Sequence, residues 1–167
     1  MTADTVCLRR LTLTDAPATL VLMQRAEGGL GRLPHEMDLV WMEQTLSGAL
    51  SGGLAIGAWE SVRLIGMIKV SRMASVQFQH ILSDLTVAVA PEWQGRGIGP
   101  RLFTQLLNDA ATLDPKVERV ELLVREGLDH AIRLYERAGF CIEGRFERRF
   151  RLANGTYDAD LQMVLFL

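Results

Sequence analysis

Short segments rich in apolar residues, several of them alternating with period two, predict β-strands. The expected strands are Thr5 to Leu13, Leu54 to Trp59, Arg63 to Met73, His80 to Val89, Val117 to Val124, Phe140 to Arg151 and Tyr157 to Phe166. The second and third of these form a hairpin around Glu60-Ser61. The last two form a hairpin at Asn154-Gly155, because Asn-Gly favours the tight turn that joins antiparallel strands.

Four other segments carry apolar residues at helical spacing. They run from a cap at Thr14 or Asp15 to just before Gly28-Gly29, from Glu36 to Leu46, from Ile98 to Thr112 and from Asp129 to Ala138. The stretch Gly28 to Pro34 is an expected loop. Gly139 follows the last helix, at the position where a glycine commonly ends one.

The order of these elements predicts the fold class. It is strand, two helices, three strands, helix, strand, helix and two strands. We expect an α/β fold with a mixed, mostly antiparallel central sheet of about seven strands and helices on both faces. Only the strand–helix–strand unit around the helix of residues 98–112 requires a parallel crossover. The length of 167 residues predicts one domain, residues 1–167.

Composition excludes several classes of protein. Hydrophobic residues make up 49% and charged residues 23% of the chain, a balance that disordered chains do not have. The net charge of −2 argues against a nucleic-acid partner. Two cysteines without zinc spacing predict reduced thiols and no metal. No membrane-spanning stretch or export signal is apparent, so we expect a cytoplasmic protein without a membrane partner.

A glycine-rich turn precedes the clearest helix and carries the first chemical indication. Its sequence is Gln94-Gly95-Arg96-Gly97-Ile98-Gly99. Glycines let the backbone approach a ligand, and the unpaired N–H groups of a helix N-terminus attract a phosphate. The spacing differs from that of dinucleotide folds, and Pro100-Arg101 stands where a P-loop has Lys-Ser/Thr. The alternative is a turn that only packs the helix on the strand.

Two motifs together resemble the GNAT superfamily of acyl-CoA-dependent N-acetyltransferases. The segment Val87-Ala88-Val89-Ala90-Pro91-Glu92-Trp93 followed by the glycine turn is similar to that family's strand and pyrophosphate loop. The segment Ala131-Ile132-Arg133-Leu134-Tyr135-Glu136-Arg137-Ala138-Gly139-Phe140 is similar to its second signature. The expected helix and strand lie between them. The resemblance implies the acyl-CoA N-acyltransferase fold and acetyl-CoA as co-substrate.

The resemblance also implies roles for individual residues. The backbone at Val87, Ala88 and Val89 holds the pantetheine arm and polarises the thioester carbonyl, and residues Gln94 to Gly99 hold the pyrophosphate. Tyr135 donates a proton to the departing thiolate. A phenol suits this role because it is protonated at pH 7. The alternative for Tyr135 is an aromatic residue of the core.

Amide formation requires a neutral amine, so a base is expected. Asp84 occupies the position where the amino-acid-acetylating branch has an acidic residue, and we place it ahead of Glu121. The alternative for both is a solvated or ion-paired carboxylate. His35 and Trp41, with Glu121, are the candidate substrate-binding residues. A further likeness to the branch that acetylates amino acids and phosphinothricin rests on spaced residues: Pro34-His35, Asp38, Trp41, Glu43 and Asn154-Gly155-x-Tyr157.

Three positions depart from the family pattern. Leu128 replaces a common cofactor-contacting asparagine, Pro100 lacks an N–H group, and Leu123 replaces the glutamate of the ribosomal-protein-acetylating branch. The expected activity is N-acetylation of a small primary amine, an amino acid or analogue. A peptide N-acetyltransferase and a non-catalytic acyl-CoA-binding module are the alternatives. The resemblance and the strand-rich C-terminus, whose edges need covering, predict a homodimer.

Overall fold

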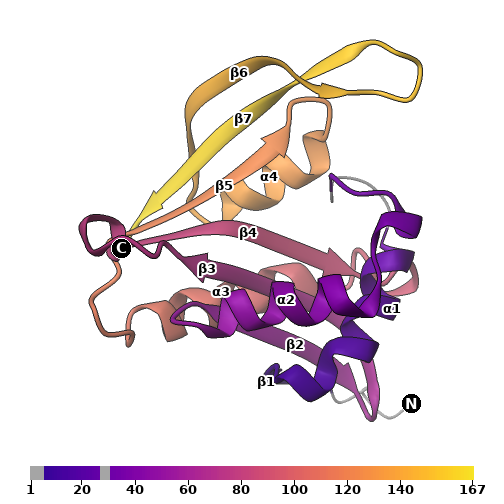
Figure 1. The fold of residues 1–167 in the computed structure, drawn as a ribbon, viewed down its shortest axis with the longest axis vertical. Coiled ribbons are helices and arrows are strands. Elements are labelled where there is room, and N and C mark those ends of the chain that lie inside the picture. Colours follow the sequence, from indigo (N-terminus) through magenta and orange to yellow (C-terminus); the bar gives the residue numbers. More distant parts are fainter. Residues whose placement is uncertain (1–5, 27–30) are drawn as a thin grey trace.

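Seven strands form one sheet in the order β1-β2-β3-β4-β5-β7-β6, in a computed structural model that describes residues 6–26 and 31–167. The strands are β1 (Val6–Arg10), β2 (Leu54–Glu60), β3 (Arg63–Arg72), β4 (Ile81–Val89), β5 (Arg119–Arg125), β6 (Cys141–Arg151) and β7 (Tyr157–Phe166). The helices are α1 (Ala16–Arg25), α2 (Leu39–Leu50), α3 (Ile98–Ala110) and α4 (Asp129–Arg137). The predicted fold class, element order and two hairpins are confirmed (Figure 1).

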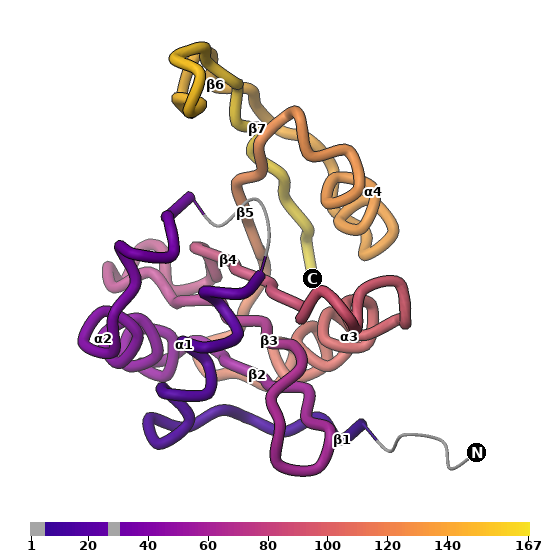
Figure 2. Tube along the Cα trace, turned by 90° about the vertical axis from the view of Figure 1, so that its right-hand side faces the viewer, coloured from indigo at the N-terminus to yellow at the C-terminus, as the bar shows by residue number. Residues whose placement is uncertain are grey.

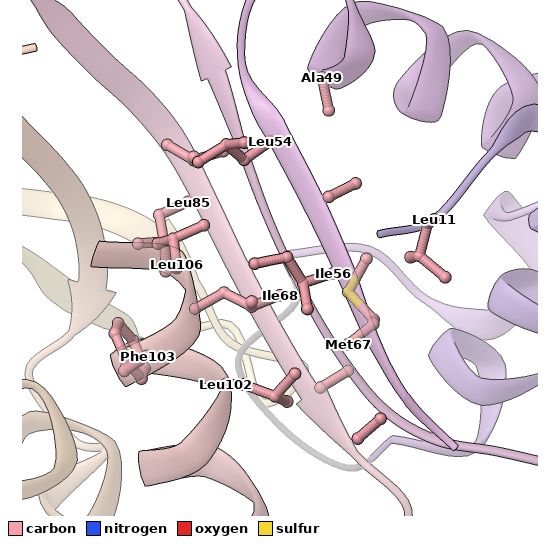
Figure 3. Close-up of a cluster of buried hydrophobic side chains, with 14 of the residues drawn as sticks. Leu11, Ala49, Leu54, Ile56, Met67, Ile68, Leu85, Leu102, Phe103 and Leu106 are labelled. Atoms are coloured by element: carbon pink, nitrogen blue, oxygen red, sulfur yellow. The ribbon is translucent and has the colours of Figure 1, made fainter. Parts of the chain in front are cut away.

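Helices cover both faces of the sheet, as expected. Figure 2 shows α1 and α2 on one face and α3 and α4 on the other. The core lies between these layers around β2 and β3. In Figure 3, Leu102, Phe103 and Leu106 of α3 approach the sheet from one side, and Leu11 and Ala49 lie on the other side. These five side chains are at most 2% exposed. The first half of the sheet is therefore buried on both faces.

The second helix ends at Leu50 and not at the predicted Leu46, and two further predicted boundaries are wrong for local reasons. The first strand ends at Arg10, because Leu13–Asp15 forms a 3₁₀ turn that leads into α1. The second helix begins at Leu39, since Asp38 Oδ1 accepts a hydrogen bond from the Trp41 N–H at 2.7 Å and so caps the helix. Thr5, Gly28-Gly29 and part of the expected loop 28–34 lie outside the described residues.

The sheet opens between β4 and β5. This is the single parallel pair among the described strands, as predicted, and its ladder contains only the pairs Ile81↔Arg119 and Leu82↔Val120. Just beyond, Asp84 has a φ of 53° at a register shift between β3 and β4. The two strands then run apart. None of the helices in the described ranges has the length and apolar character needed to cross a membrane.

Candidate active site

A cavity of about 1040 Å³ occupies the opening between β4 and β5. Both faces of the sheet contribute to its wall. From the face that carries α3 and α4 come Ile98, Leu134 and Tyr135. From the opposite face come Asp84 and Glu121. The opening thus joins, in one space, both predicted carboxylates and the predicted cofactor residues except Arg96.

The glycine turn forms one end of this cavity. Gly95 and Gly97 have φ values of 72° and 79°, a region that favours glycine, and Gly97 is the N-cap of α3. A Cβ atom on either residue would meet no heavy atom within 4 Å, so the turn is open on the side where side chains would project. Gln94 Nε2 donates to the Val89 carbonyl at 3.2 Å and holds the turn against β4. The result is an open cradle at the positive end of a helix dipole.

The other residues of the turn have different positions. Gly99 packs against α4, since a Cβ there would lie 3.4 Å from Leu134 Cδ2. Arg96 does not line the cavity, and its guanidinium lies 4.9 Å from the centre of the Trp93 ring. The sequence motif therefore combines residues that face the cavity with residues that fix the turn.

The wall on the β4 side consists of Val87, Ala88 and Val89. On one side these residues pair with Ile68, Met67 and Gly66 of β3. On the other side, β4 has no strand partner in the described residues beyond Leu82. Backbone groups of β4 that point toward β5 are consequently available to an extended ligand carrying amide groups.

Tyr135 lies on the opposite wall with its ring in the core. The residue is 9% exposed, and its ring makes edge contacts with Phe103 and Phe140, at centroid distances of 5.7 and 6.3 Å. Burial raises the pKa of its hydroxyl to about 12. Tyr135 is thus an aromatic residue of the core that also lines the cavity, and its hydroxyl stays protonated at physiological pH.

Asp84 has a partner that sequence reasoning missed. The Lys69 ammonium donates a hydrogen bond to Asp84 Oδ2. The Lys69 side chain is only 5% exposed, whereas that of Asp84 is 71% exposed. A buried ammonium needs such a counter-charge, and the left-handed backbone of Asp84 turns the carboxylate toward it. A lysine among the apolar residues of the predicted strand 63–73 was the signal that could have revealed this pair.

Glu121 is also paired. Its Oε2 lies 2.9 Å from Arg119 Nε and accepts a hydrogen bond from Gln162 Nε2 at 3.4 Å. Arg119 also binds Glu143, and the hydrogen bonds to both carboxylates hold the pKa of its guanidinium above the usual value. Glu121 is thus part of a charge network on the open face of β5, where it still lines the cavity.

The two other predicted substrate residues lie apart from this cavity. His35 is exposed in the 3₁₀ turn Pro34–Glu36, and Trp41 is half-buried near the start of α2, with the Arg32 guanidinium 5.2 Å from its ring centre. Neither residue lines the cavity beside Tyr135 and Asp84. Within residues 6–26 and 31–167, no three His, Cys, Asp or Glu side chains gather in a way that could hold a metal ion.

Comparison with known proteins gives a consistent picture. The model of the acetyltransferase (GNAT) family matches residues 22–140. The chain is 25% identical over 126 residues to the L-amino acid N-acetyltransferase AaaT of Escherichia coli strain K12, covering 75% of each chain. It is 31% identical over 159 residues to the N-alpha-acetyltransferase RimI of Mycobacterium tuberculosis, covering 92% of this chain and 90% of that one.

A solved structure shows the same fold. The phosphinothricin acetyltransferase of Sinorhizobium meliloti, determined in complex with AcCoA, superimposes with a TM-score of 0.84 at 17% identity, over 98% of this chain and 89% of that one. The family model covers well over half of the chain, and its matched range contains the glycine cradle, the opened strand pair and Tyr135. The chain therefore belongs to the GNAT family of acetyltransferases.

Proposed function

We propose that this chain transfers an acetyl group from acetyl-CoA to the primary amine of a small molecule, an amino acid or an analogue of one. The observation that carries the proposal is the single cavity that connects the glycine cradle and Tyr135 on one face of the sheet with Asp84 and Glu121 on the other. A donor and an acceptor can enter from opposite faces and meet in the opening. This arrangement supports direct transfer without a covalent enzyme intermediate.

The cavity suits acetyl-CoA in three respects. The cradle at Gly95 and Gly97 has room beside its backbone for a pyrophosphate. The edge of β4 at Val87 and Val89 has no strand partner toward β5 in the described residues and offers backbone groups to the amides of a pantetheine arm. Pro100, the third residue of α3, cannot donate a backbone hydrogen bond, so the preceding residues supply the N–H groups of the cradle. Acetyl-CoA supplies a thioester, whose carbonyl carbon is the electrophile.

The residues of the chain supply the proton transfers. Asp84 Oδ2 is bonded to Lys69, which leaves Oδ1 to accept a proton from the acceptor ammonium through water. The neutral amine forms the new C–N bond as the C–S bond breaks. Tyr135 gives its proton to the departing sulfur, and its raised pKa means that the hydroxyl is protonated at neutral pH and carries the proton to be donated.

A second candidate acceptor is the N-terminus of a protein. The 31% identity to a mycobacterial N-alpha-acetyltransferase favours it. Leu123, at the position of the glutamate expected in the ribosomal-protein-acetylating branch, argues against it. We also retain the proposals of a cytoplasmic protein and of a homodimer. The dimer is supported by β6, an edge strand that exposes Ile142 and Phe146.

Thiol release from acetyl-CoA tests the proposal, with a panel of amino acids, polyamines, aminoglycosides and N-terminal peptides. Replacing Tyr135 with Phe should lower kcat about 100-fold, because the leaving thiolate loses its acid, while calorimetric CoA binding stays unchanged. Tyr157→Phe is the matched control, since Tyr157 is exposed on β7 outside the cavity wall. Asp84→Asn should lower kcat/KM for the same amine.

The pH profile adds an independent check on the acid. With a pKa of about 12, Tyr135 stays protonated, so the wild-type rate should show no alkaline loss assignable to Tyr135 below about pH 11. Full turnover by the Tyr135→Phe variant would refute the proposed role of Tyr135 as the proton donor. CoA binding without turnover of any amine would favour a non-catalytic acyl-CoA-binding module instead.

A further inference from the structure

Arg125 is the last residue of β5 and lines the active-site cavity. Residues 120, 122 and 124 of this strand are buried toward α4, so Arg125 belongs to the alternate set that also contains Glu121 and Leu123. This is the face from which an acceptor would enter. The glycine cradle belongs to the start of α3, on the other face.

Within the described residues, Arg125 has no counter-charge, unlike its neighbours. Its guanidinium lies 4.5 Å from the centre of the Phe150 ring, and its buried Nε has no hydrogen-bond partner in the same ranges. No carboxylate of the described residues lies within 4.0 Å of it. By contrast, Arg119, Arg145 and Arg149 each contact at least one carboxylate. A half-buried cation with an unmet donor, facing a cavity, indicates an anionic ligand.

The strand register makes the missing counter-charge of Arg125 more informative. Asp160 of β7 stands directly opposite Arg125 in the β5–β7 ladder. The Asp160 carboxylate nevertheless binds Arg149 Nε, at 3.2 Å, from the neighbouring strand β6. Arg149 thus takes the counter-ion that the ladder would otherwise give to Arg125. The stack on Phe150 holds the Arg125 guanidinium while leaving it uncompensated.

We propose that Arg125 binds the carboxylate of the acceptor and selects a free amino acid; this assignment rests on the proposed function. The acceptor face then has opposite charges at its two ends, with Arg125 at one and Asp84 and Glu121 at the other. Leu123, 45% exposed, lies between them on β5 as an apolar surface. This charge pattern orients a zwitterion with its ammonium on the side of the carboxylates and its carboxylate at Arg125.

The proposal separates the two acceptor classes. The α-amine of a free amino acid lies beside a carboxylate, whereas the α-amine of a peptide lies beside a neutral amide. An amide leaves the guanidinium without its ion pair, so a peptide N-terminus loses the contact that would position it. The same holds for polyamines, which would place positive charge beside Arg125.

The test compares L-leucine, L-methionine, L-phenylalanine and L-lysine with their amides. Wild-type protein should prefer an acid over its amide, and Arg125→Gln should reduce that preference about 10- to 100-fold, mainly through KM. Arg125→Lys should retain part of it. Comparing the acid-to-amide ratio between proteins cancels the different pKa values of the amines. Arg148→Gln is the matched control, because Arg148 stacks on Tyr157 at 4.7 Å and does not line the cavity.

Three results would overturn the assignment. The first is an unchanged acid-to-amide ratio in Arg125→Gln, and the second is a raised KM for acetyl-CoA as its sole effect. Calorimetric titration of the same amino acids into CoA-saturated protein provides a readout without turnover. Binding that Arg125→Gln abolishes supports the assignment even where the transfer reaction fails. Absence of both binding and turnover for every amino acid is the third overturning result.

Discussion

Strands β2 and β6 are both antiparallel members of one sheet, yet their surroundings are opposite. The first six residues of β2 are buried, because α1 and α2 cover one face and α3 covers the other. No residue of β6 is buried, and the β6–β7 hairpin extends past the rest of the sheet in Figure 1. The sheet therefore has two halves. One half is covered by helices on both faces and stabilises the fold. The other half is covered by α4 alone, and its free face carries charged side chains. The candidate active site lies where the two halves meet.

The charges of the second half mostly form pairs at the surface. Arg119 binds Glu143 and Arg145 binds Glu126, both in partly exposed positions where ion pairs contribute little stability. Such a face tolerates polar residues that select a substrate, since no buried packing depends on them. This explains why every candidate for acceptor recognition in the cavity is on or beside β4 and β5, and none is on β2.

The strongest test of the comparison makes the same isoleucine-to-alanine substitution once in each half of the sheet. Ile68 in β3 is fully buried, and Ile142 in β6 is 52% exposed. Ile68→Ala should lower the free energy of unfolding by about 2–5 kcal/mol through lost burial and a cavity. Ile142→Ala should change it by less than about 0.5 kcal/mol. Urea unfolding measures both, and similar losses would contradict the division into two halves.

Two glycines with the same backbone conformation sharpen the comparison next. Gly97 at the junction has a φ of 79° and Gly155 in the hairpin turn has a φ of 84°, and a methyl group added to either would meet no heavy atom within 4 Å. Replacing either glycine with alanine should lower the free energy of unfolding by about 1–2 kcal/mol through backbone strain. Only Gly97→Ala should also weaken CoA binding, about tenfold, because its methyl group enters the cradle. Calorimetric titration with CoA distinguishes the two variants. Equal CoA affinities would contradict the proposal that the turn at Gly97 binds the pyrophosphate.

The smallest expected effect concerns two ion pairs. The hydrogen bond from Arg9 lowers the pKa of Asp15 to about 2, and the Asp15 side chain is 10% exposed. A lowered folded-state pKa stabilises the protein above the unfolded value near pH 4, and this contribution disappears as the pH falls through about 2. Asp15→Asn should therefore cost about 1–2 kcal/mol at pH 7 and little near pH 2.

The matched pair lies in the open half. Glu126 contacts Arg145 with 44% of its side chain exposed, and Glu126→Gln should leave the thermal midpoint unchanged at pH 7. Thermal denaturation of both variants from pH 7 to pH 2 measures the contrast. A loss in Glu126→Gln equal to that in Asp15→Asn would show that exposure does not determine the value of these pairs.

The fold was predictable because each half repeats simple local rules. The strand around Ile68, the helix that begins at Ile98 and the Asn154-Gly155 turn follow from hydrophobic period and turn chemistry. Boundaries failed where a side chain determines them, as when Asp38 caps α2 and its first residue falls three positions after the expected start. A cap residue is visible in a sequence, but the helical spacing alone places the start at Glu36 and does not use the cap at Asp38.

The site was predictable only where a continuous motif encodes it. The glycine turn and Tyr135 lie in such motifs, and the structure places both on the cavity. The Lys69 partner of Asp84 and the uncompensated charge of Arg125 depend on strand register, which brings together residues far apart in the sequence. No single segment contains that information.

The sparse β4–β5 ladder has a consequence for protein engineering. Two residue pairs and the contacts of Phe103 with Tyr135 and Phe140 connect the halves around the opening. Among the described strands, the β6–β7 hairpin pairs only with itself and with β5. Exchanging the hairpin beyond Phe140 for that of a relative would therefore retain the glycine cradle and Tyr135 while replacing part of the cavity wall, which makes this junction the natural crossover point for recombining specificities.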